Sequence, residues 1–372
     1  MKHTVVLGSG VVGMSIAWEL VRRGQRVTVV DRSQPGRQAS WAGAGILAPS
    51  NEHTAIHPLD QLTAVSNRLH DEWSAELKAE TSIDNGYQVC GGIYLARSLG
   101  EQAALTGLTG YWKECQIDFR SLSSAELAGH YPQLVTEGIR MALWVPSEAQ
   151  IQNPHHLKAL KAGCEKRGVE FVLVKEDCVF ETVSDSLVSV QLGTRKIRAD
   201  SFCIAAGAWT SQLLQPLGIQ LSMIPVRGQM LLYQLNEIGT TTIFNEGSRY
   251  VVPRRDGHVL VGSSTEEAGF SSTTTPQVLR DLEAFSESLI PQLTRERLIG
   301  SWAGLRPATY DGFPYLGRLP GLANGFVATG HFKIGLQQST GTAQILADLV
   351  EGQSPVIDIA PFDPARVKEE IS

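Results

Sequence analysis

Residues 4–13 read TVVLGSGVVG, a short apolar run followed by three glycines spaced as G-x-G-x-x-G. The run is rich in β-branched residues and predicts a strand that stops at Gly8. After the third glycine, apolar residues recur at helical spacing, and Gly24 is suited to end the predicted helix. Residues 25–30 then predict a second strand with Asp31 at its tip. This order of strand, glycine loop, helix and strand is typical of a unit that binds a dinucleotide.

Each glycine of this loop is predicted to have its own structural role. Gly8 permits the tight turn, Gly10 lets backbone amides approach a pyrophosphate, and Gly13 lets the helix pack closely on the strand. Asp31 can accept both hydroxyls of a ribose, and its charge would repel the 2′-phosphate of NADP. By itself the loop does not separate NAD from FAD. We assign to the cofactor site Gly8, Gly10, Val11, Val12, Gly13, Asp31 and Arg32.

A second segment of small residues, RQASWAGAGILAP at 37–49, favours a flavin. Small residues let a flat ring system or its ribityl chain approach the backbone, whereas NAD dehydrogenases more often continue into another crossover helix. Residues 200–209 and 325–330 are apolar strands that stop at a glycine, and a helix predicted over 335–349 would stabilise a reduced flavin through its N-terminus. To the cofactor site we add Ala39, Ser40, Ala44, Gly45, Ile46, Cys178, Gly207, Gly330, His331, Phe332, Lys333, Ile334, Gly335, Leu336 and Gln337.

The composition of the chain predicts a globular protein. The 372 residues suggest about two domains of common size, and 42% hydrophobic with 19% charged residues is globular composition. A net charge of −6 gives no reason to expect a nucleic acid or an anionic membrane surface as partner. The five cysteines are scattered, and the chain opens without a basic leader or a long apolar stretch. We therefore predict no metal site, no transmembrane segment and a cytoplasmic location.

Three segments of the chain resemble the FAD-dependent glycine oxidase branch of the D-amino-acid oxidase superfamily, and the likeness extends over essentially the whole chain. They are residues 39–49, residues 302–317 with WAGLRP and DGFPYLG, and GHFKIG at 330–335. The resemblance implies an α/β fold (α+β overall) in which a Rossmann-like domain, discontinuous in sequence, binds FAD non-covalently beside a substrate domain built on a large antiparallel sheet. We expect the FAD-binding domain at residues 1–84, 147–222 and 303–372, and the substrate-binding domain at 85–146 and 223–302.

Arg306 is the predicted substrate anchor, because a guanidinium can grip a carboxylate through two parallel hydrogen bonds. The resemblance places a substrate-facing tyrosine at Tyr250, whose hydroxyl can donate to the same carboxylate. The alternatives are a structural arginine and a core tyrosine. The chain also departs from the family: Lys333 stands where glycine oxidases usually carry an arginine, Ser248 where relatives have a histidine, and Thr265 where a larger apolar side chain is expected. We expect these changes to reshape the pocket and admit N-substituted or larger amino acids.

The sequence thus predicts FAD-dependent oxidation of glycine or another small amino acid or amine. The α-carbon would give a hydride to flavin N5, dioxygen would be reduced to hydrogen peroxide, and the imine would hydrolyse to an oxo acid and ammonia. The resemblance also implies a role in thiamine biosynthesis and a homo-oligomer, a tetramer in relatives. Three alternatives stay open: a D-amino-acid or N-substituted amino-acid dehydrogenase that passes electrons to a quinone or protein, a flavin- or nucleotide-binding protein without catalysis, and an NAD dehydrogenase.

Overall fold

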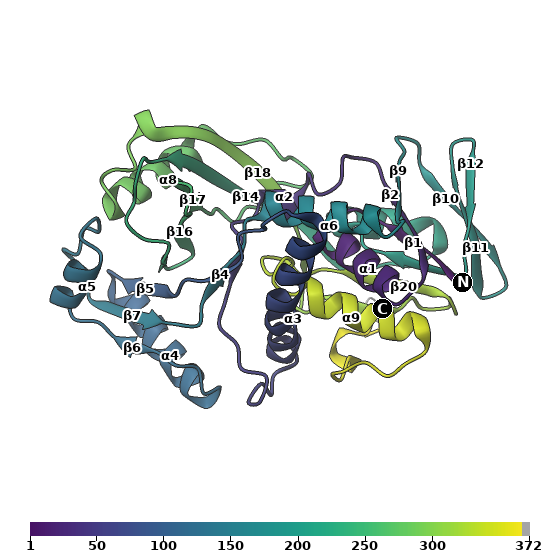
Figure 1. The fold of residues 1–372 in the computed structure, drawn as a ribbon, viewed down its shortest axis with the longest axis horizontal. Coiled ribbons are helices and arrows are strands. Elements are labelled where there is room, and N and C mark those ends of the chain that lie inside the picture. The colour runs from purple at the N-terminus through teal and green to yellow at the C-terminus, as the bar shows by residue number, and fades with distance from the viewer. Residues whose placement is uncertain (367–372) are drawn as a thin grey trace, which may run out of the picture.

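The computed structural model describes residues 1–366 and has a large β-sheet toward each end of an elongated molecule (Figure 1). The first sheet has six strands in the order β19-β20-β13-β1-β2-β9, parallel except for β19. Its strands are β1 (His3–Leu7), β2 (Arg26–Asp31), β9 (Glu170–Leu173), β13 (Ser201–Ile204), β19 (Tyr315–Arg318) and β20 (Gly325–Thr329). The central strands are buried because helices cover the sheet, which is why they read as continuous apolar runs.

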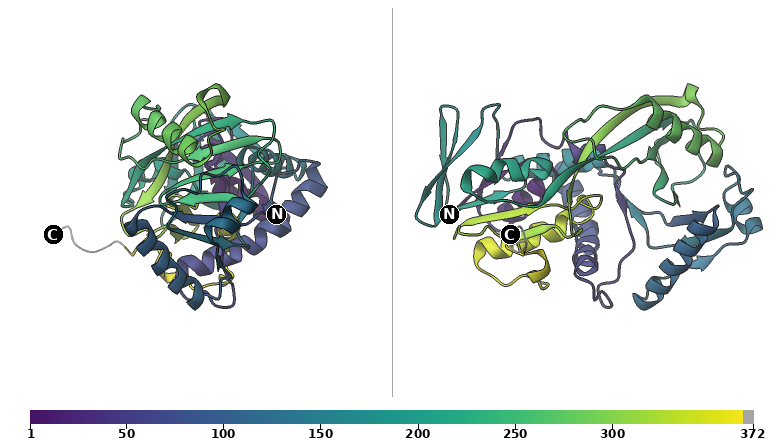
Figure 2. Two further views of the ribbon diagram at one scale, coloured as in Figure 1. Left: turned by 90° about the vertical axis from the view of Figure 1, so that its left-hand side faces the viewer. Right: turned by 180° about the vertical axis from the view of Figure 1, so that it is seen from behind.

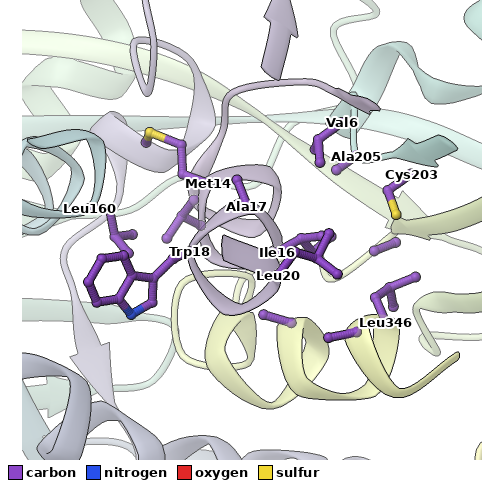
Figure 3. Close-up of a cluster of buried hydrophobic side chains, with 14 of the residues drawn as sticks. Val6, Met14, Ile16, Ala17, Trp18, Leu20, Leu160, Cys203, Ala205 and Leu346 are labelled. Carbon is purple, nitrogen blue, oxygen red and sulfur yellow. The ribbon is translucent and has the colours of Figure 1, made fainter. Parts of the chain in front are cut away.

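Four helices pack beside this sheet: α1 (Val11–Arg22), α3 (Pro58–Thr81), α6 (Asn153–Lys166) and α9 (Ser339–Glu351). Figure 3 shows the core that they share, with Trp18 of α1 beside Leu160 of α6, and Leu346 of α9 on the other side of α1. Helix α1 ends before Gly24, whose φ of +80° only glycine adopts readily, so the predicted helix end is confirmed.

The prediction of a helix from residue 335 is wrong, because α9 begins four residues later, at Ser339. Residues 335–338 form turns instead. The carbonyl groups of Leu336 and Gln337 both accept from the buried ring of His70, at 3.1 and 2.9 Å. A side chain from α3 therefore holds this stretch, which the periodicity of the sequence alone does not reveal.

The second sheet has eight strands in the order β18-β14-β17-β16-β15-β5-β7-β6, antiparallel except where β15 meets β5. Its strands are β5 (Gly92–Ala96), β6 (Arg120–Ser121), β7 (Met141–Val145), β14 (Met223–Gln234), β15 (Ile243–Glu246), β16 (Arg249–Pro253), β17 (His258–Gly262) and β18 (Leu298–Thr309). Helix α8 (Pro276–Leu289) packs on β14 and β17, while α4 (Leu99–Glu114) packs on β5 and α5 (Ser124–His130) lies near β5 at the same end of the sheet. The long strands β14 and β18 reach back toward the first sheet (Figure 2).

Smaller elements complete the chain. They are the sheet of β10 (Cys178–Val183), β11 (Ser186–Leu192) and β12 (Arg195–Arg198), the sheet of β3 (Ile46–Leu47), β8 (Ala149–Gln150) and β4 (Gln88–Val89), and helices α2 (Ala39–Ala42) and α7 (Thr210–Leu214). The predicted fold class is confirmed. The domain boundaries stay a prediction, and the end of the segment 303–372 lies outside the described residues. Over residues 1–366, no helix combines the length and apolarity needed to cross a membrane.

Candidate active site

A cavity of about 930 Å³ is lined at one end by the carboxyl ends of β1 and β2, and at the other by β14, β16 and β18. The structure thus brings together segments that lie more than three hundred residues apart in the chain. All the predicted site residues line this cavity except Gly13 and Gly330, which stand directly behind its wall. The carboxyl end of a parallel sheet is where α/β proteins commonly bind nucleotides.

Two glycines of the loop, Gly8 and Gly13, cannot carry a side chain. A Cβ on Gly8, whose φ is +110°, would lie 2.3 Å from the carbonyl oxygen of Ala205, and a Cβ on Gly13 would lie 1.9 Å from that of Gly8. Helix α1 starts after Gly10 without a side-chain cap and carries no acidic residue in its first turn. The Val11 amide donates to the Ser40 hydroxyl, and the other first-turn amides and the positive dipole end of the helix remain available to a pyrophosphate.

The small-residue segment 37–49 lies against this loop. Ser40 accepts a hydrogen bond on Oγ from the backbone amide of Val11 at 2.9 Å, and the side-chain amide of Asn153 donates to the Ser40 carbonyl at 2.7 Å. Gly45 has a φ of +70°, and a Cβ there would lie 1.9 Å from the Ile151 carbonyl oxygen. The segment therefore borders the cavity with backbone rather than bulk, which leaves room for a flat ring system.

Asp31 ends β2 at the cavity wall. Its two carboxylate oxygens accept from the backbone amides of Ser9 and Ser33, at 2.6 and 2.9 Å, and from the hydroxyls of the same two residues at 2.6 and 3.1 Å. The amides orient the carboxylate, while the hydroxyls can rotate away and leave lone pairs for a ribose. Arg32, the next residue, forms an exposed ion pair with Asp177 at the same end of the cavity.

The loop of residues 330–337 forms part of the cavity wall. Gly330 and Phe332 have positive φ values of +85° and +48°, and the amide of Phe332 donates to the carbonyl of Pro307 at 2.8 Å. His331 is buried, and its Nε2 lies 3.0 Å from the hydroxyl of Thr342. Burial lowers the pKa of His331 to about 4, so this ring is neutral at pH 7.

Arg306 lies at the opposite end of the cavity from Asp31. Its Nη1 donates to the Ser264 carbonyl at 3.0 Å and its Nη2 to the Ser263 hydroxyl at 2.8 Å. Burial lowers the pKa of Arg306, and the neighbouring Tyr250 opposes this effect. Among the side chains that the structure describes, no carboxylate lies at ion-pair distance from its guanidinium. A half-buried cation without an anionic partner is suited to bind a carboxylate.

The remaining predicted substrate residues line the same cavity as Arg306. The hydroxyl of Tyr250 lies 3.4 Å from the sulfur of Met230, and Ser248 is exposed at the cavity edge. Burial, and then the charge of Arg306, lower the pKa of Lys333, which also lines the cavity. Thr265 is exposed and lies outside the cavity lining, so the expectation that this residue reshapes the pocket directly is wrong.

Many cavity-lining residues were absent from the sequence prediction, and among them are Gly228, Ser263 and Asn153. Gly228 had a readable signal, because a glycine just before an apolar strand run marks a close approach of another group. That group is Arg306, whose guanidinium lies where a Cβ on Gly228 would be, 2.1 Å from Nη2. Ser263 and Asn153 have no such signal, since only the packing of distant segments brings them to the site.

Residues 3–349 match the model of the family described as "FAD dependent oxidoreductase" (DAO). The chain is 34% identical to a glycine oxidase of Pseudomonas aeruginosa, with 98% of this chain and 99% of the relative covered. It is 32% identical to a glycine oxidase of Pseudomonas putida, with 98% of each covered. The crystal structure of glycine oxidase from Geobacillus kaustophilus superimposes with a TM-score of 0.90 at 28% identity, over 98% of this chain and 99% of that one.

Proposed function

Because this chain belongs to the FAD dependent oxidoreductase family, we propose that it oxidises glycine or another small amino acid and passes the electrons to dioxygen. FAD, when bound, accepts a hydride from the α-carbon and reduces dioxygen to hydrogen peroxide. The imine product then hydrolyses to an oxo acid and ammonia. The glycine cradle, the helix start without an acidic residue and the space beside residues 37–49 fit this cofactor.

One observation carries the proposal: Arg306 has no anionic partner among the described residues. The guanidinium has five N–H groups, of which Ser263 and Ser264 occupy two. The others can bind a substrate carboxylate and so hold the α-carbon in one place. Tyr250, beside Arg306, can donate its hydroxyl to the same carboxylate.

The protein needs no dedicated base in this scheme. An amino acid that binds with a neutral amine uses its nitrogen lone pair to assist the loss of hydride, and water accepts the proton released beforehand. The residues of the site then act mainly by orientation and by exclusion of water from the buried side of the cavity.

The substrate range is set by the residues next to Arg306. Ser248 is small and exposed where it lines the cavity, and Lys333 offers a second positive charge there. We therefore expect turnover of N-substituted or larger amino acids as well as glycine. A cytoplasmic location, a homo-oligomer such as the tetramer of relatives, a role in thiamine biosynthesis and the two-domain division given above belong to the same proposal.

The decisive experiment is an anaerobic titration of the purified holoenzyme. We expect a flavin spectrum that bleaches on addition of glycine, sarcosine, D-alanine or D-proline, and peroxide formation when air is admitted. Bleaching without peroxide would indicate a dehydrogenase, and a colourless protein would refute FAD binding. A strong and exclusive preference for glycine would contradict the broader substrate range.

Arg306→Ala tests the anchor itself. We expect kcat/KM to fall at least about 10²-fold, since a charge-assisted bidentate contact is lost, while the visible spectrum of the bound flavin persists. Arg306→Lys keeps the charge but loses the planar fork, and we expect only partial recovery. An unchanged KM in Arg306→Ala would show that this residue is structural.

A further inference from the structure

Residues 263–266, which follow β17, hold the guanidinium of Arg306. Ser263 accepts from Nη2 through its hydroxyl, at 2.8 Å, and Ser264 accepts from Nη1 through its backbone carbonyl, at 3.0 Å. A guanidinium is planar, so two bonds to one short segment define the plane of its fork. Whatever fixes this segment also fixes the direction in which Arg306 can bind a carboxylate.

The segment is fixed by Glu266. One carboxylate oxygen of Glu266 accepts from the Ser264 hydroxyl at 2.6 Å and from the Gln229 side-chain amide at 2.8 Å. Its other oxygen accepts from the Arg227 guanidinium at 2.7 Å. The Ser264 hydroxyl in turn accepts from the backbone amide of Gln229 at 3.0 Å. The hydroxyl and the carbonyl of Ser264 are therefore both hydrogen-bonded, which fixes the orientation of this residue.

Backbone bonds join the same partners. The amide of Arg227 donates to the Glu266 carbonyl at 2.8 Å, and the amide of Glu266 donates to the Arg227 carbonyl at 3.0 Å. The side chain of Arg227 is 9% exposed and that of Glu266 is 23% exposed, so this ion pair is only weakly screened by water. The contact therefore behaves as a fixed anchor on β14.

Alternation along the strand separates this anchor from the cavity. Arg227 and Gln229 flank Gly228, so their side chains point to one face of the sheet while Arg306 lies over Gly228 on the other. In the same way, Ser264 and Glu266 face the anchor, and Ser263 lines the cavity. Arg227, Gln229 and Glu266 do not line the cavity.

We propose that Glu266 is a positioning residue for substrate binding: it holds Ser263 and Ser264 so that the free N–H groups of Arg306 face the substrate carboxylate in one orientation. The proposal rests on the function of Arg306 proposed above. Glu266 contacts neither the substrate nor the cofactor, and its effect reaches the substrate only through Arg306.

The test measures carboxylate binding apart from turnover. Acetate is titrated into the FAD-loaded enzyme and its Kd is read from the flavin spectrum. We expect Glu266→Ala to raise the Kd of acetate about 10- to 100-fold, since a misplacement near 1 Å can cost that much. Glu266→Gln keeps an oxygen for Ser264 but loses the charge facing Arg227, and we expect a rise of about three- to tenfold. The flavin spectrum without acetate should not change.

A matched control is the ion pair between Arg23 and Asp348, which has the same 2.7 Å distance and similar burial but lies away from the cavity. Asp348→Ala should lower the melting temperature and leave the Kd of acetate unchanged. In an Arg306→Ala background, Glu266→Ala should add no further loss, because its effect passes through that guanidinium.

Two outcomes distinguish the positioning role of Glu266 from the proposed function of Arg306. If Arg306→Ala weakens acetate binding but both Glu266 variants bind it as tightly as the parent, the positioning role is overturned and the proposed function stands. If Arg306→Ala itself leaves the Kd unchanged, the proposed function of Arg306 fails first. Should Glu266→Ala not fold, the Glu266→Gln variant carries the test alone, and an unchanged Kd overturns the proposal.

Discussion

Substitution of Gly228 by alanine should displace Arg306 without unfolding the protein. An alanine Cβ would lie 2.1 Å from Nη2, 2.2 Å from Cζ and 2.3 Å from Nη1 of Arg306. Ordinary contact begins near 3.4 Å, so the guanidinium must move by about 1.3 Å. It can move, because it is the far end of a flexible side chain. The new position would break or lengthen its bonds to Ser263 and Ser264.

A shift of this size should lower kcat/KM about 10²-fold, equivalent to about 2.7 kcal/mol of transition-state stabilisation. The strand itself should tolerate alanine, which costs less conformational entropy than glycine, so the melting temperature should hold or rise. Steady-state kinetics, acetate titration and thermal unfolding measure the three quantities.

Gly300→Ala is the matched control, since it lies in β18 and its nearest neighbour to a new Cβ is 4.0 Å away. It should leave kinetics and acetate binding unchanged. Gly228→Ala with the parent's kcat/KM and acetate affinity would refute the assignment of Arg306 as the carboxylate anchor in this geometry.

Two further predictions concern the cofactor and the core. The Gly13→Ala variant should lose most of its bound FAD and melt at a lower temperature, because the new Cβ would lie 1.9 Å from the backbone carbonyl oxygen of Gly8, which cannot move away. The flavin absorbance per chain measures the FAD occupancy. Full occupancy would contradict the prediction. Burial lowers the pKa of three histidines below the ordinary value of 6.5. The pKa falls to about 4 for His70, to about 3 for His156 and to about 4 for His331. The unfolded chain therefore binds more protons below pH 6.5, so the free energy of unfolding should fall as the pH drops, by about 2 kcal/mol for each histidine at pH 5. Urea unfolding at pH 7 and pH 5 tests this, and equal stabilities would count against it.

Several elements of the fold follow from preferences that act locally along the chain. The strand at residues 4–7, the helix that ends at Gly24 and the strand ending at Asp31 were all readable, because steric and periodic preferences act over a few residues. The start of α9 was not, because His70 from a distant helix takes the carbonyls of Leu336 and Gln337. The pocket role of Thr265 failed for a similar reason, since the direction of its side chain depends on how its segment lies beside β14.

The sequence by itself determined the dinucleotide unit and the fold class, and it predicted which residues could bind a carboxylate. Those features follow from residue spacing and side-chain chemistry, which can be read directly from one sequence. The tertiary structure alone decided where Arg306 points. Its guanidinium lies over Gly228 and bonds to Ser263 and Ser264, contacts that span about 40 to 80 residues of chain. Such contacts arise only when β14, β17 and β18 pair in register, because each strand supplies one part of the support.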